Sequence, residues 1–414
     1  MNPHRMAWGI AYNFPVVQVA ALATLIGMLF SKGRKLPPVT PAVVIWALFV
    51  LWMCFTTIFA LNPTDAIPAW SRMIKIQAMV LVTLILLTDR TRIDGLVWVI
   101  VVSLGFFGVK GGLFTVLTGG SYRVWGPPDS FIEGNNEIAL ALVVVIPLMR
   151  YLQLQLKKRW QRLAMFGCMG LSGLAVLGSY SRGAFLAAGA MLTFMWWKGR
   201  HKLALLVPLI AASLIALTFM PEAWRDRMFT IEHYDKDASA LGRINAWNFA
   251  VNLAKDRPLT GGGFDTFTKE LFAKYAPVPT DVHDAHSIYF EIIGEQGFPG
   301  IVLYLLMGYL MFRSARRAAR TARATPGMEW AADLSSMLYV SLLGFAVGGS
   351  FLGLAYFDLP YQLMAIIVVM DRLTAEAAKN PQALIVGAAD VTGQPALPRL
   401  ASTLSIFRRP RVPP

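Results

Sequence analysis

Five stretches of this 414-residue chain contain no charged residue over 18 to 24 consecutive positions. A helix of about 20 apolar residues is long enough to cross the hydrocarbon core of a bilayer. Charged residues make up only 15% of the chain, whereas soluble domains contain about 25%. The sequence therefore predicts an all-α polytopic membrane protein and argues against a soluble enzyme. The five stretches are residues 11–30, 39–60, 163–181, 203–220 and 334–357.

Six weaker candidates raise the expected number of crossings to eleven. Alternate loops between the spans hold 24 of the 38 Lys and Arg residues, and the positive-inside rule makes those loops and the C-terminus cytoplasmic. Eleven crossings would leave Met1 outside, so we expect an upstream helix that brings the number to twelve; a true N-out insertion is the alternative. The weaker candidates are residues 68–88, 93–109, 137–149, 183–197, 286–312 and 359–371.

The spans divide the chain into four predicted parts. Residues 1–220 carry the first eight spans, and residues 221–285 form a helical segment on the outer face, which in a bacterium is the periplasm. Residues 286–375 hold the last three spans. Residues 376–414 form a disordered cytoplasmic tail, whose arginines can contact the anionic lipids of the inner membrane.

Charge and cysteine content exclude several other classes of function. The net charge of +14 would suggest nucleic acid for a soluble protein, but here the basic residues mark topology, so no nucleic-acid partner is expected. Cys54 and Cys168 lie in apolar runs and are interpreted as packing residues. Asp235 and Asp237 form a DxD pattern in an acid-rich segment, where such a match arises readily by chance. The sequence therefore predicts neither a metal nor a cofactor.

Arg182 is the first candidate for a functional residue. It lies in a polar turn between two apolar runs, within GSYSRGAFLAAGA at residues 178–190, and so at the outer edge of the membrane. A guanidinium group binds phosphate oxygens in bidentate fashion, which favours a phosphate or diphosphate site. The alternative is an arginine that reaches a lipid phosphate at the interface. Arg123, in the segment 121–136 on the same side, belongs either to a lid or to an interfacial aromatic belt.

Residues 242–264 predict an amphipathic helix with Arg243 near its start and Trp247 one turn later. Arg257 and Pro258 end that helix, and we take Arg257 and Trp247 as secondary substrate-binding candidates. The glycines at 261–263 lack the strand, the spacing and the lysine of a P-loop, so they predict a flexible turn in preference to a phosphate loop.

Two of the five histidines stand where the outer segment re-enters the membrane, in DVHDAHSIYFEIIGEQGFPG at residues 281–300. A helix that begins near His286 would place Tyr289 one turn below it, and Gly297, Pro299 and Gly300 would kink the helix. An interfacial histidine is often a structural hydrogen-bonding group. Because His283 and His286 flank an acid and face outer arginines, we interpret them as functional.

Three motifs together resemble the O-antigen ligase and polymerase superfamily: SRGA at a tight turn, an Arg-x-x-x-Trp helix before DRPLxGxG, and AHSIYxxxxxExGxxG entering a span. The resemblance runs from Asn2 to Tyr361 and is close to the branch of putative O-glycosylation ligases associated with exosortase systems. It implies a GT-C-like helical fold and metal-independent transfer of a glycan from undecaprenyl diphosphate, in lipopolysaccharide biosynthesis. On matching positions, it also implies that Arg182 and Arg243 bind the diphosphate and that His286 is essential.

The expected function is therefore an O-antigen ligase whose acceptor is lipid A-core. A glycosyl diphosphate needs stabilisation of the departing charge, which two arginines supply, while His286 accepts the proton of the attacking hydroxyl in an inverting displacement. Three alternatives remain at this point: a protein O-oligosaccharyltransferase, an O-antigen polymerase with the same donor, and a secondary transporter. The transporter is disfavoured because the polar residues gather at one membrane face and no internal repeat is visible.

Overall fold

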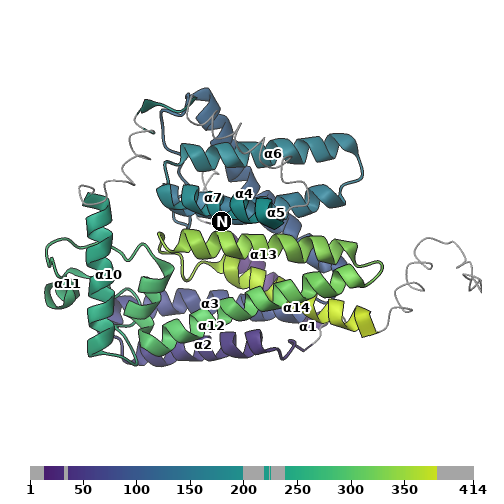
Figure 1. Ribbon diagram of the computed structural model, residues 1–414. Coiled ribbons are helices and arrows are strands. Elements are labelled where there is room, and N and C mark those ends of the chain that lie inside the picture. The colour runs from purple at the N-terminus through teal and green to yellow at the C-terminus, as the bar shows by residue number, and fades with distance from the viewer. Residues whose placement is uncertain (1–13, 32–35, 199–218, 223, 225–237, 380–414) are drawn as a thin grey trace, which may run out of the picture.

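The computed structural model describes residues 14–31, 36–198, 219–222, 224 and 238–379, and all regular structure in these residues is helical (Figure 1). The predicted all-α polytopic membrane fold is confirmed. Seven helices in the described part are long and apolar enough to cross a membrane, namely α2, α3, α4, α5, α6, α12 and α13. The elements are α1 (Val16–Phe30), α2 (Pro41–Ile58), α3 (Pro63–Leu86), α4 (Arg90–Leu117), α5 (Asn135–Gln155), α6 (Arg159–Gly178), α7 (Arg182–Lys198), α10 (Ala238–Asp256), α11 (Lys269–Tyr275), α12 (Ile288–Ala324), α13 (Glu329–Gly349) and α14 (Asp358–Lys379).

Ten of the eleven predicted spans coincide with a helix in the described residues. The eleventh, 203–220, lies almost entirely outside them, as do Asp235, Asp237 and the tail from residue 380. Helices α1 and α7 have only 15 and 17 residues, and α14 carries several charged side chains in its second half. The total of eleven or twelve crossings therefore stays a prediction.

Helix α12 extends past the predicted span 286–312. It continues to Ala324, through basic residues that the sequence assigned to a loop between spans. Alanine and arginine are strong helix formers, and this stretch consists largely of both. Ala315, Ala318 and Ala322 also give the helix a small, buried face, and Arg317 pairs with Asp371 of α14. Good propensity and tertiary packing together carry the helix past the end of its apolar stretch.

The helices run roughly side by side, and α4 and α6 pack closely (Figure 1). Glycines on one face of α4 allow the close approach: a Cβ on Gly112 would lie 2.1 Å from the carbonyl oxygen of Leu171. Small residues serve this purpose in membranes, where helix association depends on van der Waals packing instead of the hydrophobic effect. The α4–α6 contact is therefore set by residues that have no side chain.

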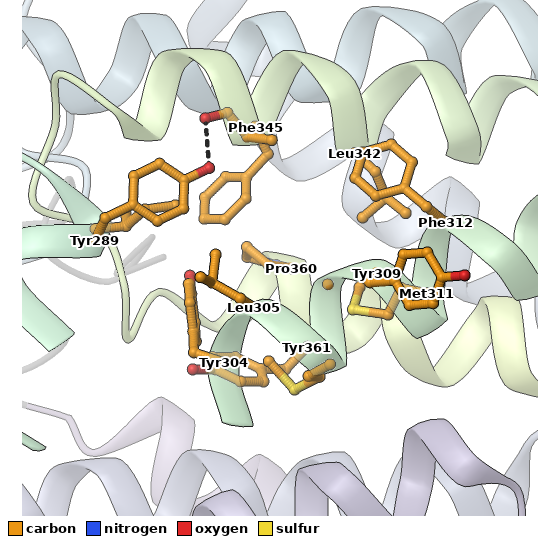
Figure 2. A pocket seen from close by; sticks show the side chains of 14 residues that line it. Tyr289, Tyr304, Leu305, Tyr309, Met311, Phe312, Leu342, Phe345, Pro360 and Tyr361 are labelled. Carbon is orange, nitrogen blue, oxygen red and sulfur yellow. Dashed lines mark hydrogen bonds between the residues drawn. The ribbon is translucent and has the colours of Figure 1, made fainter. Parts of the chain in front are cut away.

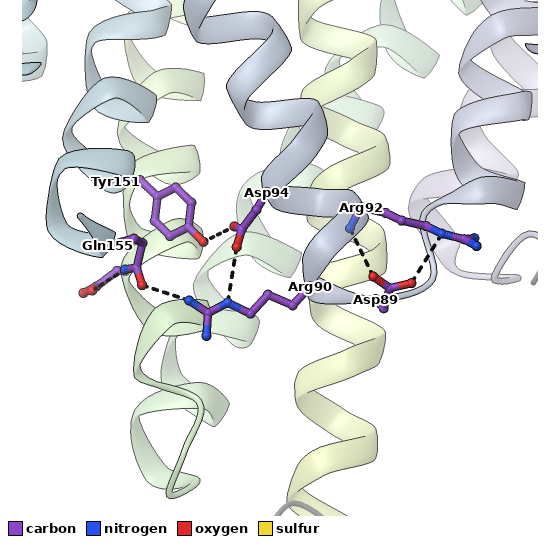
Figure 3. Close-up of polar contacts among 7 residues, drawn as sticks. Asp89, Arg90, Arg92, Asp94, Tyr151 and Gln155 are labelled. Carbon is purple, nitrogen blue, oxygen red and sulfur yellow. Dashed lines mark hydrogen bonds and ion pairs between the residues drawn. The ribbon is translucent and has the colours of Figure 1, made fainter. Parts of the chain in front are cut away.

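A polar cluster joins the start of α4 to the end of α5 (Figure 3). Asp89 caps α4, its carboxylate accepting from the backbone N–H of Arg92 at 3.1 Å. Asp94 accepts from Tyr151 Oη and from Arg90 Nε, the latter at 3.3 Å. Arg90 also donates to Gln155 at 3.1 Å. Tyr151 is fully buried, and its hydrogen bond to Asp94 fixes α5 to α4 at this end of the bundle.

At the other end of the bundle, α10 lies across the helix ends with α11 beside it (Figure 1). We call this the α10 end. Phe249 and Phe272 stack there with ring centroids 4.3 Å apart, in a small apolar core separate from that of the bundle. Its buried residues come from α10 and α11, within the segment 221–285, whose assignment to the outer face stays a prediction.

Helix α12 is broken at Gly297, which has a φ of 68° and a ψ of −171°, as the Gly-Pro-Gly pattern predicts. Donors from other elements bind the carbonyls of the three preceding residues. Gly262 N–H donates to Gly294 O at 2.8 Å, Gly263 N–H to Glu295 O at 2.9 Å, and Trp52 Nε1–H to Gln296 O at 2.9 Å. The triple glycine is thus a turn, as predicted, but it is docked on α12 by the two hydrogen bonds of Gly262 and Gly263 and not flexible. A Cβ on Gly263 would lie 2.4 Å from that of Ala60, so a side chain has no room there.

We expect Gly112→Val to destabilise the protein, because the new side chain collides with the backbone of α6. Overpacking of this kind costs about 1–3 kcal/mol. Gly95→Val is the matched control on the same helix, because a Cβ there meets nothing within 4 Å. Thermal unfolding in detergent measures both. Equal melting temperatures for the two variants would contradict the proposed role of the glycine face.

Candidate active site

The turn that carries Arg182 is as tight as predicted. Helix α6 ends at Gly178 and α7 begins at Arg182 itself, which is half-buried. Tyr180 adopts a φ of 60°, and its hydroxyl donates to Gly120 O at 2.6 Å. Asn135 Nδ2, at the start of α5, donates to Ser179 O at 2.7 Å. The backbone of the turn is therefore fixed from two sides, which holds the Cα of Arg182 in place.

The segment before α5 is an ordered loop that rests on this turn. Its Val124 N–H donates to Gly178 O at 3.0 Å. Arg123 is exposed, and its guanidinium carbon lies 5.8 Å from the centroid of the Tyr180 ring. The structure thus brings Arg123 to the turn that carries Arg182. The loop is ordered, and its Tyr122 and Trp125 are exposed, so the lid and the interfacial aromatic belt both stay predictions.

His286 stands just before α12 in a conformation that side chains rarely adopt. Its φ is 42°, and α12 follows two residues later at Ile288. Backbone strain in a non-glycine residue is often retained where function requires it. Burial lowers the pKa of His286, the positive charge of Arg243 lowers it further, and Asp284 opposes both effects. The imidazole is therefore neutral near pH 7 and able to accept a proton.

Arg243 connects His286 to the start of α5. It is half-buried on α10, and Glu137 in the first turn of α5 lies within electrostatic range of both Arg243 and Asp284. Asn135, two residues before Glu137, holds the Arg182 turn. The first turn of α5 thus contacts the turn before Arg182 and lies within electrostatic range of Arg243. Sequence reasoning did not select Glu137, because an acid in the first turn of a helix needs no functional explanation.

Trp247 positions the backbone beside His286. Its Nε1–H donates to Ala285 O at 2.7 Å, and its ring stacks on Phe290 with centroids 4.8 Å apart and planes 8° apart. One face of the indole and its only polar atom are thus engaged within the protein. A contact of Trp247 with a sugar stays a prediction.

The remaining predicted residues lie around this centre or away from it. His283 is exposed, binds Asp281 at 2.8 Å and packs on Gly242, the residue before Arg243. Arg257 follows α10 at its far end, about 20 Å from Arg243 along the helix. There it donates to Phe59 O and, at 3.1 Å, to Thr260 Oγ1. Tyr289 donates to Ala346 O at 2.9 Å. The structure thus does not bring Arg257 to His286, and the roles of all three in binding substrate stay predictions.

Glu291 is a site residue that the sequence analysis missed. It accepts from the backbone N–H of Ala355 at 3.1 Å, in the segment between α13 and α14. Gly353 of that segment packs on the backbone of His286, where a Cβ would lie 3.9 Å from the His286 nitrogen and 3.6 Å from Glu291 Oε2. Glu291 therefore holds a segment that supports the strained residue. The signal was present only as one of two acids, Glu291 and Glu295, inside an apolar span, which is a reason to suspect function.

Comparison with known proteins identifies this region. Residues 167–305 match the family described as O-Antigen ligase. This part of the chain is similar to an O-antigen ligase domain. The match spans the α6–α7 turn, α10 and the start of α12, and so contains Arg182, Arg243 and His286. The resemblance to the O-antigen ligase and polymerase superfamily is confirmed, whereas the branch within it stays a prediction.

The O-antigen ligase domain supports a membrane-bound transferase of lipid-linked glycan, acting as a ligase or a polymerase. Residues 1–156 match a family of unknown function (DUF5935), and no curated protein sequence matches the chain. Within the described residues, no group of three His, Cys, Asp or Glu side chains is arranged to hold a metal. The predicted metal independence remains to be tested.

We expect Glu291→Ala to lower the rate of glycan transfer, because the segment that supports His286 loses its anchor. A small misplacement of a catalytic group can cost about 10²-fold in rate. Glu291→Gln is the matched variant, because its amide oxygen can still accept from Ala355. Turnover number and KM, measured on purified protein, separate a loss of positioning from a loss of binding. Equal losses in both variants would contradict the positioning role of this hydrogen bond.

We also expect the transfer rate to fall at acidic pH only below the ordinary histidine pKa of about 6.5. Because the pKa of His286 is lowered, its base form persists as the pH falls and is lost on passing through that lowered value. Asp284→Asn removes a charge that raises the pKa, so the acidic limb moves to still lower pH. Glu270→Gln on α11 is the control and should leave the profile unchanged. A limb that moves upward in Asp284→Asn would contradict this assignment.

Proposed function

We propose that this protein is an O-antigen ligase of the bacterial inner membrane. It transfers a finished glycan from undecaprenyl diphosphate to a hydroxyl of lipid A-core, at the periplasmic face. The observation that carries the proposal is the strained and partly buried His286 beside Arg243, inside the O-antigen ligase domain. A neutral imidazole next to a fixed cation can serve a nucleophile and an anionic leaving group at one centre.

The arginines serve the leaving group. As the bond between the anomeric carbon and the diphosphate oxygen breaks, negative charge accumulates on the diphosphate. Arg182 and Arg243 stabilise that charge, and their planar guanidinium groups bind phosphate oxygens in pairs. A diphosphate is a weak base, so its departure needs no general acid. The site therefore needs two cations, Arg182 and Arg243, for the leaving group and a single base, His286, for the acceptor.

His286 serves the acceptor. The acceptor hydroxyl attacks the anomeric carbon from the face opposite to the diphosphate, and its proton passes to the imidazole of His286. One carbon–oxygen bond forms while another breaks, so the configuration at the anomeric carbon is inverted. The products are the glycosylated acceptor and undecaprenyl diphosphate, and His286 then releases its proton to water. The lowered pKa of His286 supports this role, because only the neutral form can accept the proton.

The positioning contacts give the proposal its geometry. Trp247 binds the carbonyl of Ala285, the residue before His286, and Glu291 binds the N–H of Ala355 in the segment whose Gly353 lies close to the His286 backbone. Arg123 lies beside the turn that begins with Arg182, so it is available for outer phosphate or sugar oxygens. A base acts well only when it is held near its target, which rigid surroundings ensure. Lipid A-core is proposed as acceptor because the long segment before His286 is typical of ligases.

The decisive experiment compares surface and lipid-linked glycan in a strain without this gene. We expect the long lipopolysaccharide ladder to disappear from gels and lipid-linked polymer to accumulate, because the final transfer is blocked. Wild-type protein should restore the ladder, whereas His286→Ala, present in equal amount in the membrane, should not.

Other patterns would contradict the proposed acceptor. Core that carries a single repeat unit would indicate a polymerase, and loss of glycan from proteins with an unchanged ladder would indicate a protein O-oligosaccharyltransferase. Full activity of His286→Ala would remove the base from the mechanism.

A further inference from the structure

An apolar cavity of about 140 Å³ lies between α12, α13 and α14 (Figure 2). Six of its fourteen lining residues are aromatic: Tyr289, Tyr304, Tyr309, Phe312, Phe345 and Tyr361. In Figure 2 these side chains surround an open space between the helices. The hydroxyl groups of Tyr289 and Tyr361 are engaged with Ala346 O and Ala355 O, both at 2.9 Å. The cavity thus presents mainly carbon to whatever occupies it.

The cavity begins directly below the candidate active site. Ile288 and Tyr289, which line it, come two and three residues after His286. On the opposite wall, Ala346 is one turn from Gly349, where a Cβ would lie 2.5 Å from Ile288 Cδ1. The part of the cavity wall formed by Ile288 and Tyr289 is therefore continuous in the chain with His286.

The same wall also leads to Arg182. Beyond Gly349 the chain reaches Phe351, which packs on Gly183, and a Cβ on Gly183 would lie 2.9 Å from Phe351 Cβ. Arg182 is the residue before Gly183. A ligand whose charged head lies between Arg182 and Arg243 thus has an apolar cavity next to its head group.

The cavity can be entered from the surrounding lipid. Leu305 and Tyr309 line it and are 51% and 59% exposed on the outer surface of α12. Gly308 lies between them, and a Cβ there would meet nothing within 4 Å. The cavity wall therefore has an opening toward the bilayer at Gly308, through which a lipid chain can enter from the membrane.

We propose that this cavity binds the first isoprene units of the donor's polyprenyl chain. The inference rests on the proposed function, because it takes the diphosphate of the donor to lie at Arg182 and Arg243. The chain is joined directly to that diphosphate, so its first units must enter hydrocarbon beside the arginines. Rigid aromatic walls suit a branched, unsaturated and stiff chain, which loses less conformational entropy on binding than a saturated acyl chain. Ordinary phospholipid is the competing occupant.

Photolabelling tests the site without requiring transfer. The probe is undecaprenyl diphosphate with a benzophenone near its diphosphate, added to the full-length protein in phosphatidylethanolamine nanodiscs. We expect labelling of the peptide that contains residues 304–312, reduced by excess undecaprenyl diphosphate and unaffected by added phosphatidylethanolamine. Equal competition by the phospholipid would assign the cavity to bilayer lipid and overturn the proposal.

A cavity-filling variant provides the matched comparison. Gly308→Phe fills the space without a backbone clash and should reduce labelling of this peptide at least about tenfold, because several buried carbon atoms of the chain are displaced. Gly173→Phe on α6 is the control, because a Cβ at Gly173 also meets nothing within 4 Å and this residue is equally half-buried. Undiminished labelling in Gly308→Phe would overturn the proposal.

Transfer assays then separate this inference from the function on which it rests. With the glycan on undecaprenyl diphosphate, Gly308→Phe should raise KM relative to Gly173→Phe. With the same glycan on a methyl diphosphate, which has no isoprene chain, the two variants should have the same KM, because nothing is left for the cavity to bind. An equal KM for both variants with the long donor would contradict the site even when transfer occurs. Wild-type protein that transfers from neither donor would contradict the proposed function, while the photolabelling result would still decide the cavity.

Discussion

In hydrocarbon, each backbone N–H or C=O group without a hydrogen-bond partner costs several kcal/mol, and α12 interrupts its own ladder at Gly297. The break is tolerated because donors from elsewhere bind the carbonyls of Gly294, Glu295 and Gln296. Two of those donors belong to the triple-glycine turn that follows α10. The requirement to satisfy three carbonyls thus ties α10 to α12. Through that tie Arg243, on α10, is carried to His286, at the start of α12.

The sequence revealed the residues of the site better than their arrangement. Arg182 was recognisable because a charge between two apolar runs is costly, and His286 because it stood where a polar segment met a span. Glu291 was not recognised, because its partner Ala355 lies 64 positions later and no local pattern announces such a contact. The position of Arg257 away from His286 was not foreseen, for the same reason. Its partner Phe59 lies 198 positions earlier, at the end of α2.

The boundaries of the helices show the same limit. Scarcity of charge located ten of the predicted spans, since it reports where a helix can lie in lipid. It could not locate the end of α12, because the stretch after Phe312 is basic and yet still helical. That continuation depends on alanine packing against α13 and α14, which is a property of three helices together. The apolar cavity is likewise a product of several helices and has no signature in any one of them.

The break at Gly297 also divides α12 mechanically. The short part before it is bound to the triple-glycine turn and to Trp52, while the long part after it packs on α13 and α14 and reaches Ala324. Long spans adjust their tilt when bilayer thickness changes. A continuous helix would transmit such tilting as a rotation of its first turn, whereas a jointed helix absorbs it at the joint. The long part of α12 can therefore change its tilt with the thickness of the membrane while the orientation of the His286 imidazole stays the same.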